Sequence, residues 1–235
     1  MNTTVIKIEE AAEALKAIAK SGRKILFVST KKQGQEVVAQ KAQEIAMPYI
    51  TERWAGGMLT NFPTIRKAVK KMSTIDKMMA DGTFNNISKR EKLQITRQRE
   101  KLEKNLGSIA DLTRLPSAVF VVDVMKEHIA VAEANRLGIP VFGIVDTNSN
   151  PNNIDFVIPA NDDATKSIEV ILSAVCAAIQ EGLEERKVEK ADEEAAAAQT
   201  ASEAPAPKER RQRVRKAAPK AEAEKVATVE APAAE

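Results

Sequence analysis

Short runs of aliphatic residues alternate with stretches of helical spacing along most of this chain. The runs cover 24–29, 118–123, 140–145 and 154–158, and they are continuous rather than alternating. Such runs are typical of strands that are covered on both faces. Apolar positions recur at helical spacing over 9–20, 34–46, 127–137 and 163–181. Strands that alternate with helices predict an α/β fold with a doubly wound, mainly parallel sheet and right-handed crossovers.

One segment does not follow this alternation of strands and helices. Between Pro63 and Leu106 no strand-like run occurs, and two polar helices are predicted over 63–80 and 88–106. Pro63 suits the first turn of a helix, and Ser88 with Glu91 three residues later makes a capping box. Each helix carries only a narrow apolar stripe, which is enough to pack against one other helix. We therefore expect an inserted, coiled-coil-like helical hairpin.

The chain therefore divides into four predicted parts. Residues 1–62 and 107–190 form the α/β domain, 63–106 form the hairpin, and 191–235 form a tail. The tail has 16 alanines and no leucine, isoleucine or aromatic residue. It cannot bury enough apolar surface to offset the entropy of ordering, so we expect a disordered tail.

Composition narrows the class of protein. With 235 residues, of which 43% are hydrophobic, the chain has room for a sizeable core. A single cysteine, Cys176, excludes an internal disulfide and suits a reducing compartment. No apolar run approaches the roughly 20 residues that span a bilayer, and the N-terminus lacks a signal-peptide pattern. These features predict a cytoplasmic protein without a membrane partner.

Charge is distributed unevenly along the chain. The formal net charge is only +3, but Arg53 to Lys104 holds 13 basic and 5 acidic residues, whereas Leu106 to Lys190 holds 7 basic and 13 acidic ones. This asymmetry suggests that the hairpin region meets a polyanion. Lysine and arginine at such density can neutralise phosphates without base contacts.

The most distinctive local sequence leads into the hairpin. It contains the chain's only tryptophan and a glycine pair that permits a sharp turn, so we assign Gly56, Gly57 and Asn61 to a structural turn. A solvated basic helix face and a phosphate-binding face explain the neighbouring cations equally well. The candidate residues of a polyanion-binding surface are Arg53, Trp54, Arg66, Lys67, Lys70, Lys71, Lys89, Arg90 and Arg97.

The strand ends offer a rival hypothesis. Lys31 and Lys32 follow the first strand and Asp146 follows a later one, where doubly wound folds bind ligands. A doubly wound enzyme or binding module for a phosphorylated small molecule would use these three residues. The lone Gly34 matches no dinucleotide or phosphate-loop motif, however, and His128 is the only histidine. We expect capping turns here, with no catalytic residue, cofactor or metal.

Several motifs in a fixed order carry a family resemblance. They are Gly22–Gln33, Arg53–Asn61, Pro116–Asp123 with Glu127 and Glu133, and Leu137–Pro140 running to Asp146–Asn148. Together they resemble the bacterial small-subunit ribosomal protein S2 family over about Thr4 to Glu185. Members of that family usually carry a few tens of residues ahead of the helix that here starts near Glu9.

The resemblance implies a fold and a role. The fold is a Rossmann-like α/β domain with an inserted helical hairpin. The role is structural: a place on the solvent side of the small ribosomal subunit between head and body, with no catalysis, cofactor or small-molecule substrate. The implied partners are ribosomal RNA and neighbouring small-subunit proteins, including the large RNA-binding ribosomal protein S1.

Overall fold

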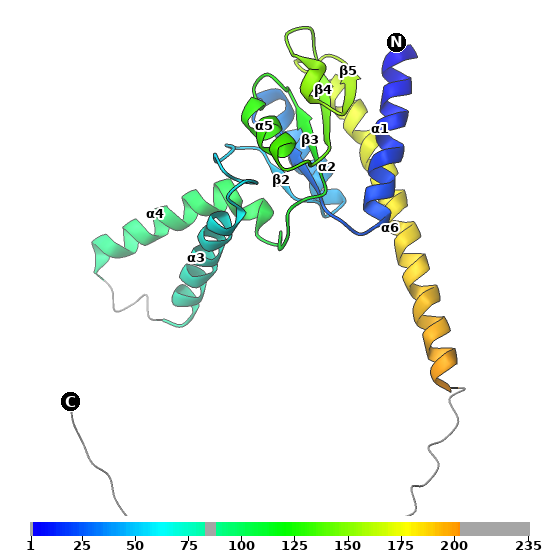
Figure 1. Cartoon of the computed structure of the whole chain (residues 1–235). Helices are drawn as coiled ribbons and strands as arrows, with labels where there is room; N and C mark the ends of the chain where they lie inside the picture. The colour runs from blue at the N-terminus through cyan, green and yellow to red at the C-terminus, as the bar shows by residue number, and fades with distance from the viewer. Residues whose placement is uncertain (1, 83–87, 203–235) are drawn as a thin grey trace, which may run out of the picture. The chain divides into compact units, whose positions relative to one another are not determined.

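A parallel five-stranded sheet forms the centre of the computed structural model, which describes residues 2–82 and 88–202 (Figure 1). The strands are β1 (Ile25–Val28), β2 (Tyr49–Ile50), β3 (Ala118–Val122), β4 (Val141–Val145) and β5 (Phe156–Pro159). Their order is β2-β1-β3-β4-β5, and every pairing is parallel. This confirms the doubly wound α/β fold that the alternating pattern predicts.

Alternate side chains of each strand enter two different cores. Ile25 and Phe27 of β1 face one core, whereas Leu26 and Val28 face the other, and all four are buried. The first core lies under α1 (Asn2–Lys20), α2 (Lys32–Glu44) and α6 (Thr165–Ser202). The second lies under α5 (His128–Arg136) and the loop that leads into the hairpin. Two covered faces explain why the strands read as continuous apolar runs.

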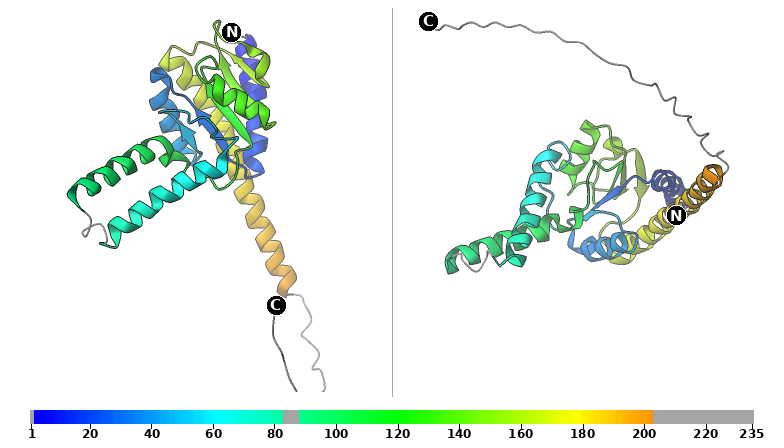
Figure 2. Two further views of the ribbon diagram at one scale, coloured as in Figure 1. Left: turned by 60° about the vertical axis from the view of Figure 1, so that its left-hand side comes forward. Right: turned by 90° about the horizontal axis from the view of Figure 1, so that it is seen from below.

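The inserted hairpin consists of α3 (Phe62–Ala80) and α4 (Lys89–Leu106), close to the predicted bounds. Figure 2 shows the two helices side by side, extending away from the sheet. Ser88 is the N-cap of α4, and its hydroxyl accepts a hydrogen bond from the Glu91 amide at 3.4 Å. Of the segment that joins the two helices, residues 83–87 lie outside the described residues.

Short 3-10 helices and small boundary shifts complete the fold. The 3-10 helices are η2 (Gly107–Ile109) and η3 (Pro151–Asn153). Helix α1 begins at Asn2, seven residues before the predicted start at Glu9, and β2 was not predicted, because two residues are too few for a recognisable run. Within the described ranges, no helix is long and apolar enough to cross a membrane.

The predicted start of the tail needs a correction. Helix α6 continues to Ser202, so residues 191–202 are helical instead of the disordered segment predicted from composition. Alanine and glutamate favour helix on their own, and a helix can therefore continue where there is nothing to bury. The rest of the predicted tail, from residue 203, lies outside the described residues.

Candidate nucleic-acid interface

The loop before the hairpin is wrapped around one buried carboxylate, that of Glu133 on α5. The carboxylate accepts five hydrogen bonds from the loop, at 2.7 to 3.2 Å. The donors are the Trp54 indole, the amides of Gly57, Leu59 and Thr60, and the Thr60 hydroxyl. Glu133 itself is 8% exposed. This carboxylate therefore fixes the path by which the chain enters α3.

Hydrogen bonding decides the charge of Glu133. Burial alone raises the pKa of its carboxyl group, because a low-dielectric surrounding disfavours the charged form. The donors of the loop, led by the Trp54 indole, outweigh this effect and hold the pKa below its ordinary value. Glu133 is therefore ionised at neutral pH and stabilises the loop as an anion.

The turn predicted for this loop depends on one glycine more than on the other. Gly57 has φ +82°, a left-handed conformation that favours glycine, and its amide is one of the Glu133 donors. Gly56 has no such φ, and a Cβ added there would meet nothing within 4 Å. Asn61 is the N-cap of α3, and its amide donates to the Gly57 carbonyl at 2.7 Å.

Three lysines of α3 form the clearest cationic surface of the hairpin. Lys67, Lys70 and Lys71 are exposed, and none forms an ion pair with a residue of the described ranges. Their spacings of three and four residues place them on one side of the helix. Ile65, Ala68 and the neighbouring apolar positions pack toward the second core instead. The lysine face is thus presented to solvent by the packing of the opposite face.

Helix α4 divides its cations between two roles. Lys89, Arg90 and Arg97 are exposed and form no ion pair with another described residue. Arg99 instead pairs with Asp76 of α3 and, at 2.8 Å, with Glu103. One ion pair between the two helices and one within α4 therefore engage Arg99, whereas Lys89, Arg90 and Arg97 remain exposed.

The remaining predicted residues lie at the base of the hairpin. Arg53 is exposed, whereas Trp54 is only 8% exposed and its indole is bonded to Glu133. Arg66 donates to the Leu112 carbonyl at 3.2 Å, which ties α3 to the loop after η2. A groove of about 530 Å³ opens beside these residues, and Arg53 and Lys101 lie among its lining.

The strand ends, where the rival hypothesis places a phosphorylated ligand, are already filled by the protein itself. The Lys31 ammonium contacts Asp162 at 2.8 Å, Asp163 at 2.6 Å and Asp123 at 3.3 Å. Burial alone lowers the pKa of Lys31, but the hydrogen bonds to these carboxylates outweigh it and leave the pKa well above its ordinary value. A phosphate would meet this acidic cluster, which repels it.

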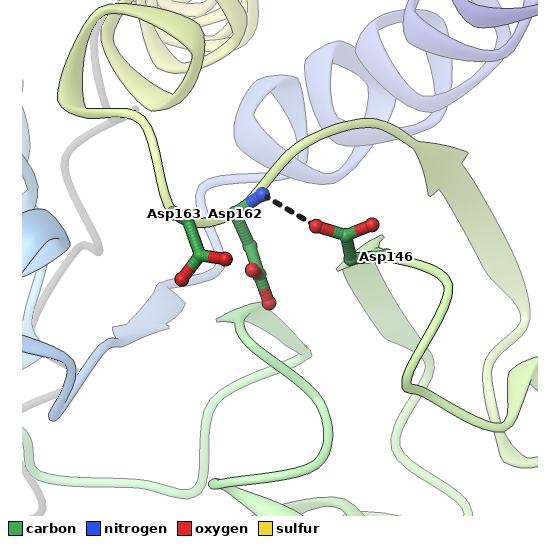
Figure 3. Close-up of side chains that lie close together, drawn as sticks. All are labelled: Asp146, Asp162 and Asp163. Carbon is green, nitrogen blue, oxygen red and sulfur yellow. Dashed lines mark hydrogen bonds between the residues drawn. The ribbon is translucent and has the colours of Figure 1, made fainter.

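Asp146 forms no ion pair with Lys31, and backbone amides hold its carboxylate instead. Its carboxylate accepts from its neighbour Thr147 at 2.7 Å and from the Asp162 amide at 3.4 Å, the bond drawn in Figure 3. These bonds, led by the one from Thr147, hold the pKa of Asp146 below its ordinary value. Asp146, Asp162 and Asp163 are the described residues whose carboxylates cluster closely enough to hold a metal ion.

Fold and surface together define a class of protein. It is a doubly wound α/β protein whose strand-end crevice is filled by internal ion pairs. Its inserted helical hairpin presents exposed lysines and arginines that form no ion pair with a described residue. The sequence profile of the family described as Ribosomal protein S2 matches residues 1–182. The chain belongs to this family, which is a structural, non-enzymatic component of the ribosome.

Curated relatives carry the same name over most of the chain. The "Small ribosomal subunit protein uS2" of Parabacteroides distasonis is 72% identical over 219 residues, which are 93% of this chain and 76% of that protein. Its namesake in Bacteroides thetaiotaomicron is 68% identical, with 99% and 82% covered. That of Bacteroides fragilis is 74% identical, with 88% and 73% covered. The family resemblance and the expectation of a non-enzyme are confirmed.

Sequence reasoning missed two residues that shape this region. From the sequence, Glu133 was named only as part of a motif, although its carboxylate holds the hairpin loop. Lys31 was named only as a possible phosphate ligand. One signal pointed to Glu133: it lies between the buried Val131 and Ala134 on α5, a place where a charge needs partners. Nothing in the local sequence pointed to the partners of Lys31, which come from distant loops.

Proposed function

We propose that this chain is a non-catalytic constituent of the small ribosomal subunit that binds ribosomal RNA through its hairpin and contacts neighbouring ribosomal proteins. The observation that carries the proposal is the exposed face of Lys67, Lys70 and Lys71, which has no acidic partner within the described ranges. RNA binding and structural support are divided between the predicted parts of the chain. Residues 63–106 supply the RNA-binding surface, and residues 1–62 and 107–190 supply the scaffold.

Binding by such a face is electrostatic. Each lysine that neutralises an RNA phosphate releases a condensed counterion, so affinity falls steeply as salt rises. Contacts of this kind fix position and orientation but read no bases. The buried Trp54 offers no stacking platform for bases, and we therefore assign no base specificity to the hairpin.

The candidate residues take two different roles. Arg53, Lys89, Arg90 and Arg97 extend the phosphate-contacting surface of the three lysines, because all four are exposed without a described ion-pair partner. Trp54 and Arg66 act indirectly, by orienting the hairpin. Trp54 holds the entry loop on Glu133, and Arg66 ties the start of α3 to Leu112, so both orient the hairpin that carries the charge.

Charge reversal of the lysine face tests the proposal. The full-length chain with Lys67→Glu, Lys70→Glu and Lys71→Glu is offered with the wild type, in equal amounts, to small subunits assembling without this protein. Differently labelled chains and mass spectrometry of the purified particles give the ratio incorporated. We expect the variant to be outcompeted at least tenfold.

A matched control separates the hairpin from net charge. Lys32, Lys166 and Lys187 are also exposed lysines but lie outside the hairpin, and changing them to glutamate alters the net charge by the same amount. This control should compete like the wild type. Equal loss in both variants, or loss in neither, would contradict an RNA-binding role for the α3 lysines.

Ribosomal protein S1 is the neighbour that we propose by name, and the support for it is the family resemblance alone. Purified small subunits that contain or lack this chain, mixed with S1 and then sedimented, test the assignment. We expect S1 to sediment in stoichiometric amount only with subunits that contain the chain. Equal sedimentation of S1 with both preparations would refute the partnership while leaving RNA binding by the hairpin intact.

A further inference from the structure

Three carboxylates meet at the carboxyl end of the sheet. Asp146 follows β4, whereas Asp162 and Asp163 lie between β5 and α6, and one carboxylate oxygen from each lies within 4.8 Å of the others. Figure 3 shows the Asp162 side chain between those of Asp146 and Asp163. Two separate loops therefore bring oxygen ligands to one place, although the sequence analysis expects no metal here.

The nearby ammonium occupies only part of this cluster. The Lys31 ammonium contacts Oδ1 of Asp162 and Oδ1 of Asp163, and it lies farther, at 3.3 Å, from Oδ2 of Asp123. The second oxygen of Asp162 and that of Asp163 are outside these contacts. Lys31 is the one cation that ion pairs of the described residues bring to this group of four carboxyl groups, those of Asp123, Asp146, Asp162 and Asp163.

One of the remaining oxygens is buried without a partner. Asp162 is 0% exposed, and its Oδ2 is one of two buried side-chain polar atoms in the described ranges that make no hydrogen bond, the other being the Ser29 hydroxyl. A buried carboxylate oxygen that nothing satisfies costs free energy, and such atoms in native proteins commonly face a water or an ion. The neighbouring carboxyl groups of Asp123, Asp146 and Asp163 favour a cation over a water at this place.

We propose that a hard divalent cation of the Mg²⁺ class binds between the carboxylates of Asp146, Asp162 and Asp163. Carboxylate oxygens are the ligands that Mg²⁺ and Ca²⁺ prefer, and Mg²⁺ usually keeps several waters and takes only a few protein carboxylates. Asp162 supplies the buried ligand. Asp163, whose side chain is 73% exposed, leaves one side of the site open to those waters.

Binding would join two loops that the backbone leaves separate. In the structure the loop after β4 touches the loop before α6 through the hydrogen bond from the Asp162 amide to Asp146, which is long at 3.4 Å. A bound cation adds a second, stronger link at the same point. The carboxyl end of the sheet is thereby braced on both sides of Asp162, by Lys31 on one and by the cation on the other.

Titration of the chelator-treated, full-length protein with Mn²⁺, followed by water-proton relaxation, tests the proposal. We expect one saturable Mn²⁺ site per chain, from which MgCl₂ displaces the ion. Asp146→Asn and Asp163→Asn should each weaken binding at least tenfold, because each removes a charged ligand. Both side chains are at least partly exposed, and circular dichroism confirms that the variants fold.

Glu13→Gln is the matched control, because Glu13 is an exposed acid on α1 outside the cluster, and it should bind Mn²⁺ like the wild type. Asp162→Asn removes the buried ligand and should abolish the site wherever that variant folds. Absence of a saturable site in the wild type would overturn the proposal, as would a site whose affinity is the same in Asp146→Asn and Asp163→Asn.

Discussion

Lysines in two regions of this molecule, the strand ends and the hairpin, have opposite environments. At the strand ends, Lys31 is largely buried, with 13% of its side chain exposed, and contacts three carboxylates. On the hairpin, Lys67, Lys70 and Lys71 are exposed and form no ion pair with a described residue. The first lysine is committed to holding the fold, and the other three remain available to a partner.

This difference shows how a doubly wound fold can lose the ligand site that its topology favours. Ligands of such folds bind at the carboxyl ends of the strands, near the point where strand order reverses. Here the same place is filled by an internal lysine and acidic side chains, which repel phosphate. The hairpin, by contrast, is an insertion that carries exposed lysines, and such an insertion can gain positive charge without disturbing the sheet.

Removal of the Glu133 carboxylate should have the largest effect on stability. Glu133→Ala leaves the buried Trp54 indole and the loop amides without an acceptor, and we expect a loss of about 4 kcal/mol in the free energy of unfolding. Urea unfolding followed by circular dichroism measures it. A loss below about 1 kcal/mol would show that the hairpin loop is held by other contacts.

Lys31 and Lys32 form a natural pair for comparison. Lys31→Met leaves the buried Asp162 and Asp123 carboxylates without their cation, so we expect a loss of about 3 kcal/mol in unfolding free energy. Lys32→Met, at an exposed position, should change stability by less than about 0.5 kcal/mol. Equal losses of unfolding free energy in the two variants would contradict the distinction between the ion-paired Lys31 and the exposed Lys32.

The lowered pKa of Glu133 predicts a pH dependence. A carboxyl group whose folded pKa lies below its unfolded value stabilises the fold above the unfolded value, and this stability is lost as pH falls through the folded one. Glu133→Gln should therefore be much less stable than the wild type at pH 7, and the gap should narrow below about pH 4. Urea midpoints at both pH values measure the gap, and a gap that stays constant would exclude the ionised form as the stabilising one.

The glycine pair gives the smallest expected difference. Gly57→Ala places a side chain at φ +82° and 3.3 Å from the Asn61 Cβ, so we expect a loss of about 1 to 2 kcal/mol. Gly56→Ala meets open space at an ordinary φ and should cost less than about 0.5 kcal/mol. Thermal unfolding of the two variants checks the order, and a reversed order would mean that the turn depends on Gly56.

Local patterns were sufficient to predict most of the fold. Four of the five strands lie where continuous apolar runs occur, because a strand covered on both faces must be apolar throughout. Both hairpin helices also begin close to their predicted starts, which Pro63 and the Ser88 cap fix locally. The two-residue strand β2 and the extension of α6 to Ser202 were missed, since neither depends on a hydrophobic pattern.

The site was predicted less completely, because its key contacts join distant parts of the chain. The density of lysines on α3 is a local property, so Lys67, Lys70 and Lys71 could be identified from their spacing. The bond between Trp54 and Glu133 spans 79 residues, and that between Lys31 and Asp162 spans 131. Partners at such separations are set by the tertiary fold, which no local pattern encodes.

The salt dependence of ribosomal RNA binding tests the central claim most directly, using the full-length chain and its Lys67→Ala, Lys70→Ala, Lys71→Ala variant. If the three exposed lysines each neutralise one phosphate, the slope of log affinity against log salt concentration should be shallower in the variant by about 3. An unchanged slope in a correctly folded variant would contradict the account, because the lysine face would then contact no RNA.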